Sequence, residues 1–271
     1  MMKGYFVIRT FVSGVIGEKI KYWVPGEKPS KSQRSIRSSV KQQERNEANA
    51  VRRVARQIHA NFGKGDSLLT PSYSEDGIKR LAKDIDQNAE DHEDRIFEAA
   101  RHDMRLWIRR TQRACAAAGV PFRYIAVTSD MDEKTGKSVR VHHHVIVNAE
   151  AAEIARKKWK GGEVHEERLF DEVDRTRLAG YLLNQVRRLP DEKKYIPSRN
   201  LITPQPKDRI ARSGAELKVP QGGQLLYRGP YMPGMPQYIR YVVPEIGKIQ
   251  KEQKKKTATG SGGCQAAEKY A

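Results

Sequence analysis

Two histidines and one tyrosine of this sequence could carry chemistry if the fold brings them together. His142, His143 and His144 are consecutive and lead into the apolar run 145–147, which predicts a strand. Because side chains alternate between the two faces of a strand, His142 and His144 share one face and His143 points to the other. Two imidazoles on one face can form part of a site for a divalent metal ion. If Tyr181 faces that ion, its hydroxyl could attack a phosphodiester and form a covalent phosphotyrosine.

A third metal ligand is less evident from the sequence. The nearest carboxylate is Asp130, directly after a predicted strand at 122–129 that should pair with the histidine strand. A mixed imidazole and carboxylate site suits Mg²⁺ or Mn²⁺ bound jointly with a phosphate. We therefore predict His142, His144 and Asp130 as ligands and Tyr181 as the nucleophile. The alternative is structural: hydrogen-bonded, inert histidines, and a tyrosine that packs in the core among leucines.

The chain is strongly basic. Of its 271 residues, 51 are Lys or Arg and 33 are Asp or Glu, which gives a formal net charge of +18. We expect a polyanionic partner, single-stranded or origin DNA, bound in a salt-dependent way, although a ribosome-associated or merely basic protein would have the same charge. Candidate DNA contacts are arginines of a predicted basic helix and others beyond Tyr181: Arg52, Arg53, Arg56, Arg187, Arg188 and Arg199. For the helix arginines, a solvated face is the alternative.

Several other classes of protein are disfavoured. Cys115 and Cys264 are too few and too far apart for a disulfide framework or a zinc site. No apolar run approaches the roughly 18 residues that a membrane span requires, and the N-terminus lacks the apolar segment of a signal peptide. We expect a soluble, reduced, cytoplasmic protein with no membrane contact.

The elements that must position these side chains follow a βαββαβ-like order. Apolar periodicity predicts helices at 39–62, 89–118, 149–159 and 171–188, and strands at 66–73, 122–129, 138–147 and 163–169. Pro71 interrupts the first of these strands, so that strand should lie at an edge or a bulge. The predicted fold class is α+β, an antiparallel sheet with helices packed on it, of the split βαβ kind.

The chain divides into four predicted regions. Residues 1–38 should form a β-ribbon and a basic loop, and residues 39–203 contain the catalytic elements. Frequent Pro and Gly predict that residues 204–250 form extended arms rather than a second core, and residues 251–271 should be a disordered basic tail.

Several stretches occur in an order that resembles a known family. They are GDSLLTPSYS at 65–74, YIAVTSD at 124–130, VRVHHHVIVN at 139–148, LAGYLLNQ at 178–185 and IPSRNLITP at 196–204. This order is similar to that of the rolling-circle replication initiators, or Rep proteins, of bacterial plasmids and phages. These belong to the HUH (histidine–hydrophobe–histidine) endonuclease superfamily. The likeness covers roughly residues 40–205.

The resemblance implies specific roles. The two motif histidines of the family bind the divalent ion, which corresponds to His142 and His144, and the nucleophile corresponds to Tyr181. The implied enzyme nicks one strand of origin DNA, stays linked to the 5′ phosphate, and leaves a 3′ hydroxyl for a DNA polymerase. Since the sequence contains no GxxxxGK[ST] loop, unwinding would depend on a host helicase. The oligomeric state is not indicated.

Three positions depart from the family pattern. His143 stands in place of a hydrophobe, Ser129 stands where relatives often carry an acidic ligand, and Asn184 and Gln185 stand where relatives often carry a lysine. Other functions therefore stay open. They are an HUH relaxase or single-strand transposase, a non-catalytic basic nucleic-acid-binding protein, and an inactive relative that kept the fold.

Overall fold

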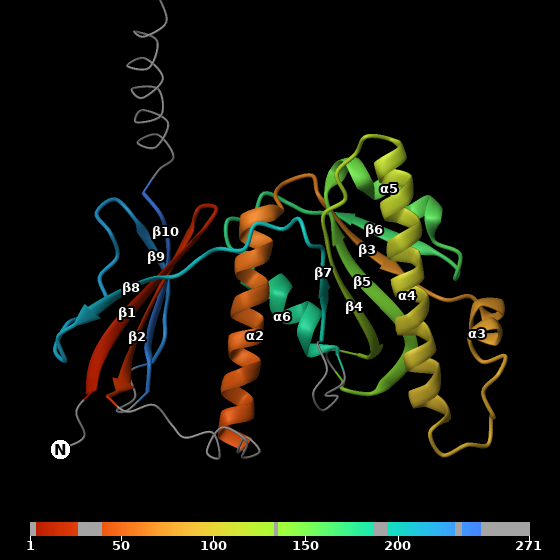
Figure 1. The fold of residues 1–271 in the computed structure, drawn as a ribbon, viewed down its shortest axis with the longest axis horizontal. Helices are drawn as coiled ribbons and strands as arrows, with labels where there is room; N and C mark the ends of the chain where they lie inside the picture. Colours follow the sequence, from red (N-terminus) through yellow and green to blue (C-terminus); the bar gives the residue numbers. More distant parts are fainter. Residues whose placement is uncertain (1–3, 27–39, 133–134, 187–193, 231–234, 245–271) are drawn as a thin grey trace, which may run out of the picture. The chain divides into compact units, whose positions relative to one another are not determined.

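Two antiparallel sheets organise the chain, each in its own unit (Figure 1). The computed structural model describes residues 4–26, 40–132, 135–186, 194–230 and 235–244. The larger unit spans residues 37–204, close to the predicted 39–203, and contains the histidines and Tyr181. The smaller unit combines residues 1–36 with residues 205–271.

The sheet of the larger unit has five strands in the order β6-β3-β5-β4-β7. These are β3 (Ser67–Pro71), β4 (Tyr124–Met131), β5 (Ser138–Val147), β6 (Val164–Arg168) and β7 (Ile196–Pro197). The β4–β5 hairpin is the one that the sequence predicts. In its register Ser129 lies opposite His142, and Val127 lies opposite His144.

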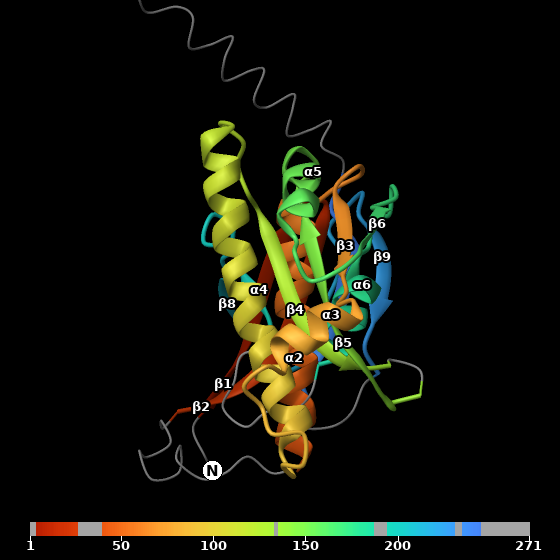
Figure 2. The same ribbon diagram turned by 90° about the vertical axis from the view of Figure 1, so that its right-hand side faces the viewer.

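Helices cover both faces of this sheet (Figures 1 and 2). One face packs against α3 (Glu75–Leu81), α4 (His92–Ala117) and α5 (Ala149–Lys158), and the other against α2 (Val40–Asn61) and α6 (Thr176–Asn184). Strand residues divide between the two cores by alternation: Val127 and Ile146 join the α2–α6 core, whereas Ala126 and Val145 join the α4–α5 core. Within the described ranges, no helix is long and apolar enough to cross a membrane.

The sequence of α4 explains its length and its orientation. Its buried residues recur every three or four positions, so they form one stripe against the sheet: Phe97, Ala100, Met104, Trp107, Ile108, Thr111 and Cys115. The helix ends at Ala117, and Gly119 then adopts a φ of 68°. This left-handed conformation is favourable for glycine and is common just after a helix.

The connection from α5 to β6 passes directly against the end of β3. A Cβ atom at Gly162 would lie 2.4 Å from Ser74 N and 2.7 Å from Ser72 O. Both neighbours are backbone atoms, so only glycine fits there. This close approach fixes the segment that follows β3.

The position of β3 differs from the prediction. It lies between β6 and β5 rather than at an edge. Pro71 is tolerated because the regular β3–β5 ladder spans only Ser67 to Leu69, so Pro71 lies beyond it. An isolated bridge between Ser72 and His142 then continues the contact with β5.

The smaller unit contains a second five-stranded sheet, in the order β8-β1-β2-β10-β9. Its strands are β1 (Gly4–Ser13), β2 (Ile16–Pro25), β8 (Lys207–Ala211), β9 (Gln224–Arg228) and β10 (Gln237–Val242). The β1–β2 ribbon confirms the prediction for the N-terminus. The prediction of extended arms is wrong for residues 207–242, which pair with the ribbon and add Leu217, Ile239 and Tyr241 to a small core. The predicted tail at 251–271 lies outside the described residues.

Candidate active site

His142 and His144 point to the α6 face of the sheet, and their Nε2 atoms lie 3.1 Å apart. The two rings are nearly perpendicular, with centroids separated by 4.8 Å. His142 Nδ1 lies 3.0 Å from the carbonyl oxygen of Arg140, which can only accept, so we assign the proton to Nδ1 and a lone pair to Nε2. On the other ring, His144 Nδ1 lies 3.3 Å from Thr70 Oγ1. The Nε2 atoms are therefore the ones that converge.

Gln185 brings an amide oxygen to this pair. Its Oε1 atom lies 3.0 Å from His144 Nε2, and its Nε2 atom donates to the carbonyl oxygen of Tyr181 at 2.9 Å. The second bond fixes the amide orientation, since only the nitrogen can donate. Gln185 is 4% exposed and ends α6 one helical turn after Tyr181.

Ser129 holds the end of α6 against the sheet. Its hydroxyl donates to the backbone carbonyl oxygen of Gln185 at 2.6 Å. The residue that stands where relatives often carry an acidic ligand thus positions the amide that reaches His144. This arrangement accounts for the small polar side chain at that place in β4.

The three converging atoms fit a divalent metal ion. With ligand distances of about 2.1 Å, the 3.1 Å and 3.0 Å separations correspond to ligand–metal–ligand angles of about 95° and 91°, close to the octahedral 90°. Within the described ranges no three His, Cys, Asp or Glu side chains are placed to hold a metal ion. A third donor from the protein must therefore be of another type, as Gln185 is. Burial, together with the neighbouring His142, lowers the pKa of His144 to about 4, so its ring is neutral at physiological pH, as a ligand must be.

Tyr181 lies beside the histidines. Its ring contacts the His144 ring in a T-shaped arrangement, with centroids 5.1 Å apart. The side chain is partly buried against the α2–α6 core. A Cβ atom at the preceding Gly180 would have only Asn184 Nδ2 within 4 Å, at 3.9 Å. The helix surface next to the tyrosine is therefore open to a large substrate.

His143 lies on the opposite face, as strand alternation predicts. Its Nδ1 atom lies 3.0 Å from Thr128 Oγ1 and its Nε2 atom 2.9 Å from the Tyr73 hydroxyl. The side chain is fully buried, and burial lowers its pKa to about 3. The Tyr73 hydroxyl also lies 3.3 Å from a carboxylate oxygen of Asp103. His143 is thus a structural residue of the α4–α5 core.

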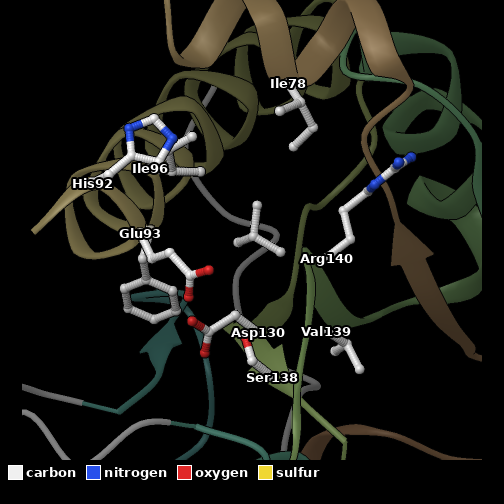
Figure 3. A pocket seen from close by; sticks show the side chains of 10 residues that line it. Ile78, His92, Glu93, Ile96, Asp130, Ser138, Val139 and Arg140 are labelled. Atoms are coloured by element: carbon white, nitrogen blue, oxygen red, sulfur yellow. The ribbon is translucent and has the colours of Figure 1, made fainter. Parts of the chain in front are cut away.

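The prediction that Asp130 is the third ligand is contradicted by its position in the sheet. The Ser129 side chain turns toward α6, and Asp130 turns to the opposite face. There it lines a cavity of about 340 Å³ with Ile78 of α3 and Glu93 of α4 (Figure 3). The irregular register between Ser129 and Met131 does not bring it back to the histidines.

The predicted DNA-binding arginines are not brought together. Arg53 is exposed on α2, whereas Arg52 is partly buried and donates to Asn49 Oδ1 at 3.3 Å. Arg56, on the same helix, is also partly buried. Arg199 is exposed and follows β7. Both Arg187 and Arg188 lie outside the described residues.

Gln185 is the residue that sequence reasoning missed. Its signal was present, since a residue four positions after Tyr181 lies on the same helix face. A carboxylate was sought instead, because carboxylates are the usual oxygen ligands of Mg²⁺ and Mn²⁺.

Comparisons with protein-family models, curated proteins and solved structures give no match for this chain. The fold is therefore defined by its class, a mixed α+β protein with two antiparallel sheets. Its function has to be argued from the site itself.

Proposed function

We propose that this protein is a metal-dependent DNA nickase of the HUH type that initiates rolling-circle replication, with Tyr181 as the nucleophile. One observation carries the proposal. His142 Nε2 and Gln185 Oε1 each lie within 3.1 Å of His144 Nε2, and the Tyr181 ring packs on the His144 ring. A metal-binding face and a tyrosine are thus adjacent on β5 and α6, in the order that the family resemblance implies.

The protein's own residues would prepare the site. His142, His144 and Gln185 would hold Mg²⁺ or Mn²⁺, which would polarise the scissile phosphate and stabilise charge on the departing oxygen. The Arg140 carbonyl orients the His142 ring, and Thr70 serves the His144 ring in the same way. Ser129 and the Tyr181 carbonyl fix Gln185.

The reaction is a transesterification. The Tyr181 oxygen forms a bond to phosphorus as the bond from phosphorus to the 3′ oxygen breaks. The phenolic proton leaves to water and the 3′ oxygen gains a proton, so no oxidant or reductant is required. The products are a 5′-phosphotyrosine link and a free 3′ hydroxyl, from which a host polymerase could extend while a host helicase unwinds.

The net charge of +18 supports a DNA substrate. A relaxase or single-strand transposase would use the same chemistry, although relaxases usually present three histidines, and here the third donor is an amide. A non-catalytic DNA-binding protein is the second candidate. It is favoured by one observation: His144 Nε2 can donate to Gln185 Oε1, so the cluster is hydrogen-bonded without a metal.

A covalent adduct tests the proposal. The full chain is incubated with Mn²⁺ and 3′-labelled single-stranded oligonucleotides that cover the DNA flanking its gene, and the products are separated on a denaturing gel. We expect a labelled protein band that disappears in Tyr181→Phe and in His142→Ala while DNA binding survives. Tyr195→Phe, on a neighbouring partly buried tyrosine, is the matched control and should retain the band. A band that persists in Tyr181→Phe, or no band with the wild-type protein, contradicts the proposal.

A further inference from the structure

A second cavity lies on the α4 side of the sheet, in the larger unit. Its volume is about 540 Å³, and it is enclosed by α4, the start of β4 and the segment after β7. Its polar lining comes mainly from Arg105, Arg109 and Gln112 of α4, Tyr124 of β4, and Arg199 and Asn200. None of these residues belongs to the histidine–tyrosine site.

The cavity concentrates positive charge. Three arginines line it and no carboxylate does. Elsewhere on α4, Arg101 pairs with Glu98 at 2.7 Å and Arg95 pairs with Asp91 at 2.9 Å. By contrast, Arg105, Arg109 and Arg199 form no ion pair with any residue in the described part of the chain. Arg105 and Arg109 are one helical turn apart, so their side chains emerge about 5–6 Å from each other.

The wall opposite α4 is rigid. Ser198 N donates to Tyr124 O at 2.9 Å, and Tyr124 N donates to Ser198 Oγ at 3.1 Å. Asn200 Nδ2 donates to Phe122 O at 3.2 Å, and the rings of Phe122 and Tyr124 pack with centroids 4.7 Å apart. Arg199 is therefore held between two anchored neighbours.

The chemistry of the lining identifies a ligand class. Guanidinium groups bind phosphate through paired, charge-assisted hydrogen bonds. The amides of Gln112 and Asn200 offer donors and acceptors for a base or sugar. Burial raises the pKa of Tyr124, so its phenol stays protonated and can donate. The volume lies within the ~300–1,000 Å³ of small-molecule sites.

We propose that this cavity binds a nucleotide of a single-stranded nucleic acid, with its phosphate on Arg105, Arg109 and Arg199. The cavity is separate from the scissile phosphate. Ser129 lies opposite His142, and Tyr124 is five residues earlier in β4, about 16 Å along the strand and on the other face. Binding here needs neither Tyr181 nor a metal ion, so the inference does not depend on nicking.

Binding to the full chain in EDTA tests the assignment. The ligands are a fluorescent oligothymidylate and, separately, fluorescent dATP, titrated by anisotropy at several salt concentrations. Arg199→Gln should weaken oligonucleotide binding about tenfold and reduce the slope of log K against log salt by about 1. The double variant Arg105→Gln/Arg109→Gln should reduce that slope by about 2. Arg113→Gln is the matched control, because this arginine is exposed on the same helix but does not line the cavity.

Two results would overturn the assignment. If Arg113→Gln weakens binding as much as Arg199→Gln does, the cavity only adds to a diffuse positive surface. If the cavity variants lose dATP binding but keep oligonucleotide binding, the site takes a free nucleotide instead. A protein that binds as expected but forms no covalent adduct would contradict the proposed nicking and leave this inference intact.

Discussion

Replacing Gln185 by alanine tests whether the amide completes a metal site. The wild-type side chain accepts from His144 and donates to the Tyr181 carbonyl, and it is buried. Truncation should therefore cost about 1–3 kcal/mol of folding free energy even without metal. That loss alone does not identify a ligand, so the informative quantity is the additional stability that Mn²⁺ provides.

The expected size of that additional stability follows from mass action. At a Mn²⁺ concentration of about 100 times Kd, the wild-type protein gains about 2.7 kcal/mol. Removing a partner from a metal's outer shell weakens affinity by about 10–100-fold, and we take this as the minimum for a direct ligand. The gain in Gln185→Ala at the same concentration then falls to about 0.4–1.4 kcal/mol.

Thermal unfolding with and without Mn²⁺ measures this difference. The wild-type Tm should rise by about 5–10 °C, and the Gln185→Ala Tm by less than half as much. Asn184→Ala is the matched control, because Asn184 is exposed on the same helical turn. An equal rise in Gln185→Ala and wild type would refute Gln185 as a ligand. No rise in any protein would refute the metal site.

Three further predictions follow from the same structure. His143→Leu should lower the free energy of unfolding by about 2–4 kcal/mol, because Tyr73 and Thr128 lose their partner, yet leave the Mn²⁺-dependent gain unchanged in urea titrations; a lost gain would make His143 part of the metal site. Gly162→Ala should destabilise the protein by more than about 2 kcal/mol, because its Cβ meets backbone at 2.4 Å, whereas Gly180→Ala should stabilise it by up to about 1 kcal/mol; the opposite order in chemical unfolding would contradict the packing. Since the pKa values of His143 and His144 are about 3 and about 4, below the ordinary 6.5, the unfolded chain binds more protons, and stability should fall by about 1–3 kcal/mol between pH 6.5 and pH 4; unfolding curves that do not change over this range would show that the rings are not buried neutral.

The elements around the site were predictable because their sequences are periodic. The stripe of α4 and the alternation in β5 each set one buried face, and the structure has these elements within a few residues of the predicted bounds. The direction of the three histidines followed from alternation alone. His143 lies between Thr128 and Tyr73 on one face, and His142 and His144 converge on the other.

The remainder depended on contacts between residues distant in sequence. The strands β8, β9 and β10 are short and separated by Pro and Gly, and they are stabilised by pairing with a ribbon some two hundred residues earlier. Local pattern does not contain that pairing. The interior position of β3 was missed for a similar reason, because Pro71 is harmless only where the ladder to β5 has ended.

The third donor at the histidines shows the same limit at the scale of one side chain. Proximity in sequence favoured Asp130, but one step along a strand reverses the face, so Asp130 points away and Ser129 points toward α6. Gln185 reaches the site only because α6 packs across the sheet. Its role could be found from its spacing to Tyr181 once the packing of that helix is known.

The most direct test of the central claim is to identify the residue that becomes linked to DNA. The adduct formed in Mn²⁺ is treated with nuclease and trypsin, and the peptide that carries the residual 5′ nucleotide is sequenced by mass spectrometry. Cleavage after Arg177 and Arg187 gives LAGYLLNQVR, residues 178–187, and we predict the nucleotide on Tyr181 within it. A nucleotide on Tyr195, in the peptide YIPSR of residues 195–199, or on any other residue would contradict the claim.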